Sequence, residues 1–323
     1  MRAAQVVALD GPDGVRVGEI GPAPVAGEDE VLIEVHSVGL SYPDLLMSEG
    51  RYQIKPEVPF VLGVDFAGVV SQDAAALGFT AGDRVAGWSA YGSAAEVVAV
   101  PSERVFPLPQ SLNFNQGAAM PLNYLTAHFA LAVRARVRPG SVVVVNGAAG
   151  GVGSAAVQIA AGLGCRVIGM VSSAEEAAFA TTMGADEIIE GASAERVRDL
   201  TGGLGADVVL DVIGSDQVVL ESLRSLTIGG RLLSLGYVAG EIPSVRLNRL
   251  LLANIDVSGV AWGPWTRAHP GFARQQWDEL MPLVDSGAVR PDVRQIVPVE
   301  DIAAAMRAML DRKSLGKTVL RFV

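Results

Sequence analysis

Residues 142–159 read VVVVNGAAGGVGSAAVQI, an apolar run followed by a glycine-rich turn and an alanine-rich stretch. This order predicts a strand, a tight turn and a helix, which is the arrangement that a dinucleotide site needs. Glycine lets the backbone approach a pyrophosphate, and a helix N-terminus offers free N–H groups to the anion. Gly150 and Gly153 fill the second and third positions of the G-x-G-x-x-G pattern, with Ala148 at the first. The alternative interpretation is a glycine turn used only for close packing.

The chain after this turn keeps alternating between two kinds of segment. We expect strands at 142–145, 166–171 and 208–212, and helices at 153–163, 174–183 and 217–226. Strands that alternate with helices form a parallel sheet with helices on both faces. The sequence therefore predicts an α/β fold for this part of the chain.

The end of the second expected strand bears on the choice of nucleotide. An NAD site places an acid there, on the ribose 2′-hydroxyl. After Val171 this chain instead has Ser172 and Ser173, and two hydroxyls at a helix N-terminus suit a 2′-phosphate, which favours NADP(H). Glu175 and Glu176 lie close by, however, and no arginine or lysine occurs in the segment. A helix cap made by the serines and glutamates is the alternative interpretation.

The parts of the chain on either side have a different pattern. Short β-branched runs between glycine and proline turns predict mostly β structure before residue 122, with strands at 31–38, 61–70 and 94–100. Near the C-terminus we expect amphipathic helices at 272–285 and 302–311 and a strand at 317–322. At roughly 150 residues per domain, 323 residues make about two domains. Whether the last strand returns to the first domain is left open by the pattern.

Composition excludes several classes of protein. Cys165 is the only cysteine, so a disulfide framework and a cysteine zinc cluster are impossible, and the three histidines lack metal-site spacing. A net charge of −10 argues against a nucleic-acid partner and favours a small molecule. The first residues lack a signal-peptide pattern, which favours the cytoplasm. The uncharged segment 139–165 has seven glycines and fits a buried strand-turn-helix better than a membrane span.

Nearly the whole chain resembles the zinc-free, zeta-crystallin-like quinone oxidoreductase branch of the medium-chain dehydrogenase/reductase superfamily. Besides the glycine turn, the resemblance rests on 38–44 (VGLSYPD), 50–52 (GRY), 62–70 (LGVDFAGVV), 125–127 (LTA) and 316–320 (GKTVL). It implies a GroES-like β-rich catalytic domain made of 1–121 with 266–323. It also implies a Rossmann domain with a doubly wound parallel sheet at 122–265.

The same resemblance locates the positions that hold zinc in other branches. Where zinc-bearing relatives have a cysteine and a His-Glu pair, this chain has Ser41, Val64 and Asp65. Without a Lewis acid, an alcohol or a simple carbonyl is hard to polarise. A conjugated acceptor is easier, because hydride added to its far carbon moves charge onto an oxygen that hydrogen bonds can hold. The resemblance thus implies a metal-free, NADPH-dependent reductase of quinones or other α,β-unsaturated carbonyls.

The resemblance also implies site residues. With Ser172 and Ser173 added, the cofactor-binding set is Ser41, Thr126, Gly150, Gly151, Val152, Gly153, Ser172, Ser173, Gly236, Tyr237, Val260, Ala261 and Lys317. The catalytic set is Tyr52, Ser41, Tyr42 and Asp44. Many relatives have asparagine at the position of Ser41, so its hydrogen bond to ribose or substrate is shorter or absent here.

Two of the catalytic candidates, Tyr52 and Asp44, each have two interpretations. Tyr52 aligns with a tyrosine that, in related enoyl-thioester reductases, donates a proton or orients the enolate, and the alternative is packing over the cleft. Tyr42 suits a wall that stacks on a flat quinone. Asp44 either hydrogen-bonds near the nicotinamide or caps the loop after Pro43.

Two further activities compete with the quinone or enone reductase. One is an enoyl-CoA or other enoyl-thioester reductase with Tyr52 as the acid. The other is a structural or regulatory protein that binds NADPH with little turnover. The apolar segment 254–260 resembles the edge strand through which relatives pair their sheets, so a homodimer is expected.

Overall fold

Residues 1–322 are described by the computed structural model, and they form two units, each with its own hydrophobic core. The first unit consists of Met1–Leu122, Pro270–Trp277 and the described residues from Pro291 onward. The second consists of Asn123–His269 and Asp278–Arg290. This division differs from the expected boundaries mainly at residues 278–290, which were assigned to the first domain. They join the second because Gln158 holds Arg290, donating to its carbonyl oxygen at 2.8 Å and accepting from its backbone N–H at 3.1 Å.

The second unit is built on a six-stranded sheet in which every pair of neighbours is parallel. Its strands are β9 (Val142–Asn146), β10 (Arg166–Val171), β11 (Glu187–Glu190), β12 (Ala206–Asp211), β13 (Leu226–Ser234) and β14 (Asp256–Gly259). The spatial order is β11-β10-β9-β12-β13-β14, the order of a Rossmann fold, with its switch point between β9 and β12. The predicted fold class is therefore confirmed.

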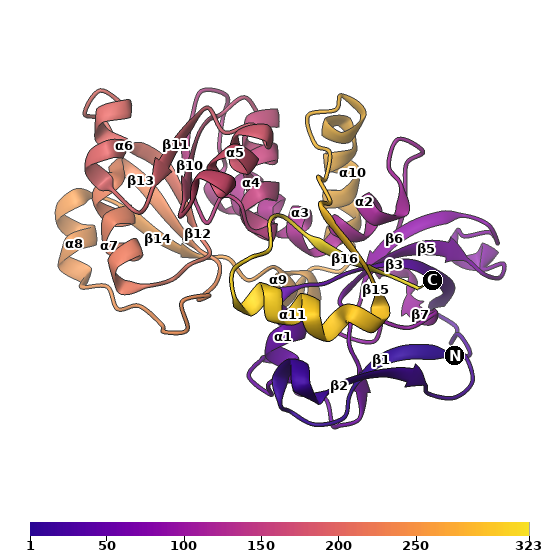
Figure 1. The fold of residues 1–323 in the computed structure, drawn as a ribbon. Coiled ribbons are helices and arrows are strands. Elements are labelled where there is room, and N and C mark those ends of the chain that lie inside the picture. The colour runs from indigo at the N-terminus through magenta and orange to yellow at the C-terminus, as the bar shows by residue number, and fades with distance from the viewer. Residues whose placement is uncertain (323) are drawn as a thin grey trace. The chain divides into compact units, whose positions relative to one another are not determined.

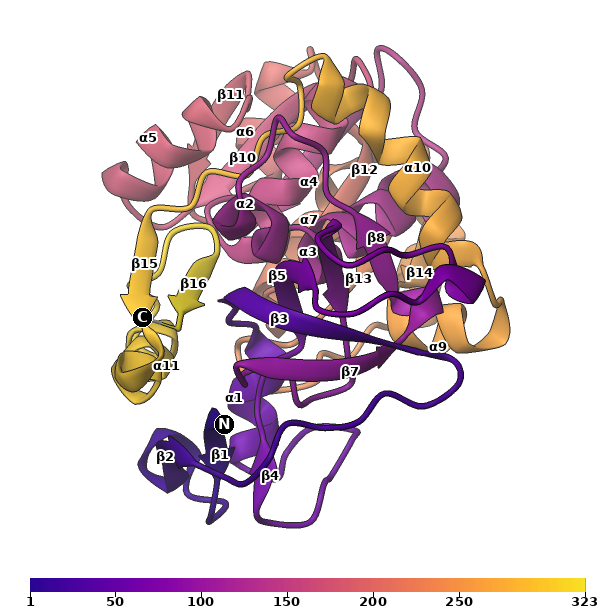
Figure 2. The same ribbon diagram turned by 90° about the vertical axis from the view of Figure 1, so that its right-hand side faces the viewer.

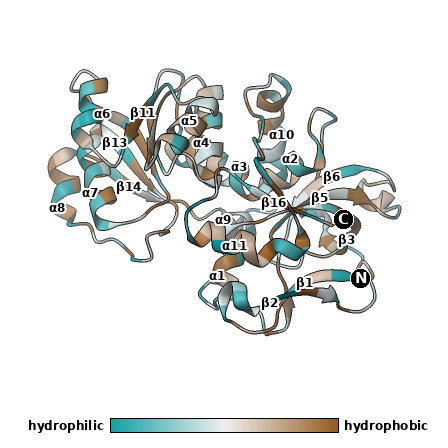
Figure 3. Cartoon of the chain, in the orientation of Figure 1, coloured by the Kyte–Doolittle hydropathy of each residue, from teal (hydrophilic) through white to brown (hydrophobic). Residues whose placement is uncertain are grey.

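The second unit also contains helices. They are α3 (Pro121–His128), which begins in the first unit, α4 (Gly151–Gly162), α5 (Ala174–Thr182), α6 (Ala194–Leu200), α7 (Asp216–Ser225), α8 (Leu247–Ala253) and α9 (Trp262–Ala268), with a π-helical turn at Phe129–Ala135. Figure 1 shows α4 and α5 on one side of the strands and α6 and α7 on the other. Hydrophobic colour runs along the strands in Figure 3, and in β9 Val143, Val144 and Val145 are fully buried, as a strand covered on both faces requires.

The first unit is mostly β structure. A three-stranded sheet contains β1 (Arg2–Val6), β2 (Val15–Glu19) and β4 (Phe60–Val61). A seven-stranded sheet contains β3 (Glu30–Gly39), β5 (Asp65–Val70), β6 (Arg84–Trp88), β7 (Val97–Pro101), β8 (Val105–Pro107), β15 (Gln295–Pro298) and β16 (Thr318–Arg321). Its helices are α1 (Tyr42–Ser48), α2 (Phe114–Ala119) and α11 (Ile302–Leu310), with α10 (Phe272–Asp285) shared between the units, and short 3-10 turns lie at Gly11–Gly14, Ala75–Leu77, Ser102–Arg104 and Val299–Asp301.

The C-terminal strand answers the question that the sequence left open. β16 pairs antiparallel with β3 and parallel with β15, and Figure 2 shows β15 and β16 side by side. The register places Leu320 opposite Val38, so strands from the two ends of the chain share one sheet. No helix among residues 1–322 is long and apolar enough to cross a membrane.

One expected strand is wrong in detail. The run 61–70 is split, because β4 ends at Val61 and β5 begins only at Asp65. Between them Gly63 has φ +99°, and a Cβ there would lie 2.3 Å from the backbone nitrogen of Ala94. The left-handed backbone at a close approach requires glycine, and it turns the chain out of the sheet. This turn positions part of the candidate site.

Candidate functional site

In the first unit, Asp44 ties the start of α1 to the turn at Gly63. One carboxylate oxygen accepts the backbone N–H of Ser41 at 2.8 Å, which caps the helix, and the other accepts the N–H of Gly63 at 2.9 Å. Asp44 itself is fully buried. Of its two interpretations, the structure thus shows the cap, and it adds the bond to Gly63 that sequence reasoning missed.

A buried ion pair lies beside this cap. The Lys317 ammonium is 2.5 Å from a carboxylate oxygen of Asp65 and 2.5 Å from Ser41 Oγ. Ser41 Oγ also donates to Asp65 at 3.0 Å, and the other oxygen of Asp65 accepts the backbone N–H of Leu122 at 2.8 Å. Because Lys317, Asp65 and Ser41 are only 5 %, 0 % and 3 % exposed, the ammonium and the carboxylate depend on each other for charge compensation.

Local sequence makes room for this pair. Gly39, in β3, faces the Lys317 side chain, and a Cβ there would lie 2.7 Å from Lys317 Cε and 2.1 Å from the carbonyl oxygen of Ala118. Asp65 opens β5 and Lys317 directly precedes β16, and both strands pair with β3. Ser41 and Asp65 therefore both bond to the Lys317 ammonium group.

Burial raises the pKa of the Asp44 carboxyl from 3.8 to about 7, although the hydrogen bonds from Ser41 and Gly63 and the nearby Lys317 oppose the rise. The folded protein then holds a proton between pH 4 and 7 that the unfolded chain releases, so this group lowers stability as the pH rises through that window. As the pH rises from 4 to 7, we expect the Tm of the wild type to fall relative to the Tm of Asp44→Asn by about 5 °C in total. Thermal unfolding at several pH values measures it, and parallel curves for the two proteins would contradict the raised pKa.

The two candidate tyrosines flank α1. Tyr42 is its first residue, and Tyr52 follows its end, and both are partly buried against the core of the first unit. Both residues thus pack against this core and are partly exposed.

In the second unit, the glycine turn lies between a strand and a helix, in the predicted order. Gly147, with φ +67°, makes the tight turn, whereas Ala148 is a fully buried residue whose N–H donates to the Met170 carbonyl in β10. A Cβ at Gly153 would lie 2.0 Å from the Gly147 carbonyl oxygen, so the third glycine allows α4 to pack against the turn. Of the three pattern positions 148, 150 and 153, only position 153 requires glycine for close packing.

Gly150 has a different role. It is the N-cap of α4 with an ordinary φ of −79°, and a Cβ there would meet only the Gly147 carbonyl oxygen, at 3.4 Å. No side chain caps the helix, so the N–H groups of its first turn, Gly151, Val152 and Gly153, have no side-chain partner from the N-cap. Since packing does not require glycine at 150, its absent side chain keeps the approach to the helix N-terminus clear. These features fit a dinucleotide pyrophosphate.

The remaining cofactor candidates of this unit follow strand ends at the same edge of the sheet. Because all six strands are parallel, their carboxyl ends meet at one edge, where ligands of such sheets bind. Ser172 and Ser173 follow β10, Gly236 and Tyr237 follow β13, and Val260 and Ala261 follow β14, where the Val260 N–H donates to the Ser234 carbonyl at 2.9 Å. Thr126 is half-buried in α3.

The serines after β10 are engaged within the protein. Ser173 Oγ accepts the N–H of Glu176 and caps α5, while the backbone N–H and Oγ of Ser172 donate to one Glu176 carboxylate oxygen at 2.6 and 2.9 Å. Ser173 therefore caps the helix, as one of the two interpretations has it, and Ser172 holds the Glu176 carboxylate.

A buried polar network at the switch point was missed. Asn146 ends β9, and its amide donates to Asp211, which ends β12, and to Ser222 of α7 at 3.2 and 2.9 Å. Asp211 also accepts the N–H groups of Ile213 and Gly214, and burial raises the pKa of its carboxyl. The network fixes the turn after β12. Its signal in the sequence was a polar residue directly after each of two apolar runs, VVVV and VVL.

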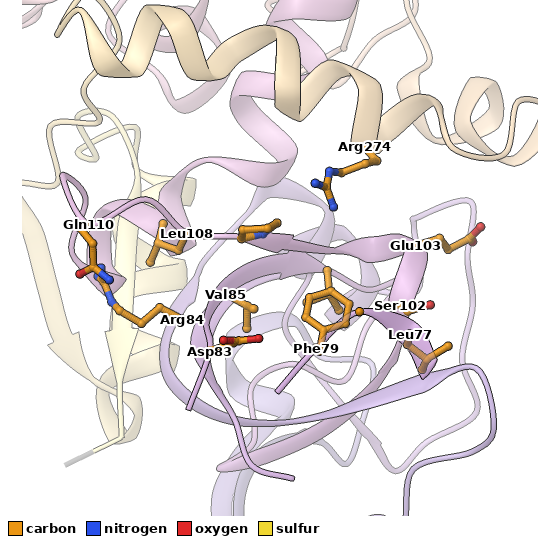
Figure 4. Close-up of a pocket in the computed structure, with 13 residues that line it drawn as sticks. Leu77, Phe79, Asp83, Arg84, Val85, Ser102, Glu103, Leu108, Gln110 and Arg274 are labelled. Atoms are coloured by element: carbon orange, nitrogen blue, oxygen red, sulfur yellow. The ribbon is translucent and has the colours of Figure 1, made fainter. Parts of the chain in front are cut away.

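A separate pocket of about 600 Å³ lies in the first unit, lined in part by Phe79, Arg84 and Arg274 (Figure 4). Arg84 points toward Gln110 and donates to its side-chain oxygen at 2.9 Å. None of the predicted site residues lines it.

Two family models match the chain. Residues 27–110 match the alcohol dehydrogenase GroES-like domain, and residues 151–286 match the zinc-binding dehydrogenase model. Quinone oxidoreductase-like protein 2 of Rattus norvegicus is 34 % identical over 99 % of this chain and 91 % of the relative. The chain belongs to the zinc-free quinone oxidoreductase branch of the medium-chain dehydrogenase/reductase superfamily. The expected family is thereby confirmed, and the chain is an oxidoreductase of that superfamily.

Solved structures of quinone oxidoreductases have the same fold. The enzyme of Thermus thermophilus, also solved with NADPH, has a TM-score of 0.85 at 36 % identity and covers 100 % of both chains. The Escherichia coli quinone oxidoreductase in complex with NADPH has a TM-score of 0.90 at 29 % identity, covering 99 % of this chain and 100 % of that one.

Proposed function

We propose that this quinone oxidoreductase family member is a zinc-independent reductase that uses NADPH to reduce a quinone or another α,β-unsaturated carbonyl. The observation that carries the proposal is the uncapped N-terminus of α4 behind Gly150, at the carboxyl edge of a Rossmann sheet. Related structures bound to NADPH support the choice of nucleotide. NADP(H), when bound, supplies the hydride.

We assign the chain's residues as follows. The N–H groups of Gly151, Val152 and Gly153 bind the pyrophosphate. The segments Gly236–Tyr237 and Val260–Ala261, with Thr126, hold the nicotinamide end. Ser41 and Lys317 give the first unit a buried hydroxyl and ammonium with which to bind cofactor or substrate, and Asp44 acts on Ser41 through its backbone. Tyr42 offers a ring for a flat acceptor.

Hydride addition to a conjugated acceptor leaves negative charge on its oxygen, and a proton must follow. Tyr52 is our candidate donor, since a phenol can deliver a proton to an enolate only when it lies close to it. This role also supports the second candidate activity, reduction of an enoyl thioester.

We expect Tyr52→Phe to lower enone or enoyl-CoA reduction by about 100-fold, because these substrates need a positioned proton donor. Quinone reduction should change by less than about threefold, because a hydroquinone anion takes its proton from water more readily. Oxidation of NADPH, followed by absorbance with quinones, enones and enoyl-CoAs, tests both statements. Equal rates for both proteins with every acceptor would leave Tyr52 a packing residue.

The same panel tests the proposed function. Turnover of quinones or enones supports it, and turnover of enoyl-CoAs alone would establish the thioester activity. NADPH binding without turnover of any acceptor would leave the third candidate, a structural or regulatory protein.

We also propose a homodimer that acts in the cytoplasm. β14 is the edge strand of its sheet, and the nearby α8 exposes Leu247, Leu251 and Leu252 by 75 % or more. An apolar edge of this kind favours pairing with a second sheet. Sedimentation of a monomer at micromolar concentration would contradict it.

A further inference from the structure

The carboxylate of Glu176 lies at the end of β10, although Glu176 belongs to the first turn of α5. One of its oxygens accepts both the backbone N–H of Ser172, at 2.6 Å, and Ser172 Oγ, at 2.9 Å. Ser172 is the first residue after β10, so these two bonds hold the acid at the strand end. Glu176 is half-buried, whereas its neighbour Glu175 is exposed.

In a Rossmann sheet, the end of the second strand is where the ribose of the nucleotide is recognised. The acid at the end of the second strand binds the ribose 2′-hydroxyl of NAD, and sites for NADP have a nearby arginine for the 2′-phosphate. The chain lacks an acid on the strand itself, but Glu176, twenty-three residues after Gly153, reaches back to the same position. The two donors that a 2′-phosphate could use on Ser172 are both occupied by this carboxylate.

The other charged groups near the end of β10 are negative, like Glu176. Glu190 ends β11 and pairs in register with Val171, the last residue of β10, so it lies at the same edge of the sheet. Glu175 adds a third carboxylate in the first turn of α5. No lysine or arginine occurs from Val171 to Glu195 in the sequence. A 2′-phosphate with nearly two negative charges would thus meet acids and no cation from this stretch.

We propose that Glu176 determines nucleotide specificity in this protein, by taking the place of the ribose-binding acid and limiting the preference for NADPH. The inference rests on the proposed nucleotide site. The wild-type protein then prefers NADPH over NADH only weakly. The serines after β10, which by themselves favour a 2′-phosphate, do not select it while Glu176 holds Ser172.

Binding of two nucleotide fragments tests this without any turnover. Calorimetry with ADP-ribose and 2′-phospho-ADP-ribose gives the ratio of their dissociation constants, for wild type, Glu176→Gln and Glu176→Lys. Glutamine still accepts a bond from Ser172 but removes the charge, so Glu176→Gln should shift the ratio toward the 2′-phosphate by about tenfold. Glu176→Lys should shift it further, because it adds a cation. Glu175→Gln is the matched control, with the same charge change one residue away and no bond to Ser172, and should shift the ratio by less than about twofold.

The outcomes separate this inference from the proposed function. If wild type binds the fragments and Glu176→Gln leaves their ratio unchanged, or if Glu175→Gln shifts it equally, the specificity role is wrong and the nucleotide site stands. If wild type already prefers the 2′-phosphate strongly, Glu176 does not limit that preference. If neither fragment binds, the proposal of a nucleotide site is wrong, and so is the specificity role of Glu176.

Discussion

Lys317→Met is expected to lower the free energy of unfolding by about 3–5 kcal/mol, because it leaves the Asp65 carboxylate buried without a counter-charge. Lys317 and Asp65 are almost fully inaccessible to solvent, so water cannot replace the missing partner. The loss also affects Ser41, whose hydroxyl bonds to both groups. Chemical denaturation of the two proteins measures the change.

A double variant separates charge from packing. In Lys317→Met with Asp65→Asn, the asparagine oxygen can still accept the Leu122 N–H and no charge is left unpaired, so most of the stability should return. NADPH-dependent turnover should stay low, since the ammonium beside Ser41 is still missing. A double variant as unstable as the single one would show that the unpaired Asp65 charge is not the cause of the instability. Full turnover would remove Lys317 from the site.

Gly153→Ala is expected to destabilise the protein by about 3 kcal/mol or more and to abolish NADPH binding. The added Cβ would lie 2.0 Å from the Gly147 carbonyl oxygen, so α4 must move away from the turn. Alanine's better helix propensity, worth at most about 1 kcal/mol, does not offset this overlap. Thermal unfolding and quenching of tryptophan fluorescence by NADPH measure the two effects.

Gly150→Ala is the matched control, with the same added methyl group three residues earlier. The backbone there is ordinary and the Cβ meets nothing closer than 3.4 Å, so stability should change by less than about 0.5 kcal/mol. NADPH affinity should nevertheless fall by about tenfold, because the methyl group faces the approach to the helix N-terminus. If Gly150→Ala binds NADPH as tightly as wild type, the pyrophosphate does not lie against this turn.

The same glycine turn shows how far the sequence could predict the site. Its place between strand and helix was correct, because such patterns depend on neighbours within a few residues. The G-x-G-x-x-G spacing did not reveal that Gly147 makes the sharp turn, since a spacing pattern does not show which residue has a positive φ. The serines after β10 likewise suggested a phosphate site, whereas their bonds to Glu176 depend on how the first turn of α5 folds back.

The sequence by itself determined the parallel sheet, the glycine turn and the family, because apolar periodicity and turn residues act over short stretches of chain. Only the tertiary structure decided which polar groups meet. Ser41 and Asp65 bond to Lys317 because β16 pairs with β3. Asn146 bonds to Asp211 because β9 and β12 are neighbours at the switch point. Burial raises the pKa of Asp211, and also that of Asp44 at the start of α1, since desolvation depends on every segment packed around a residue.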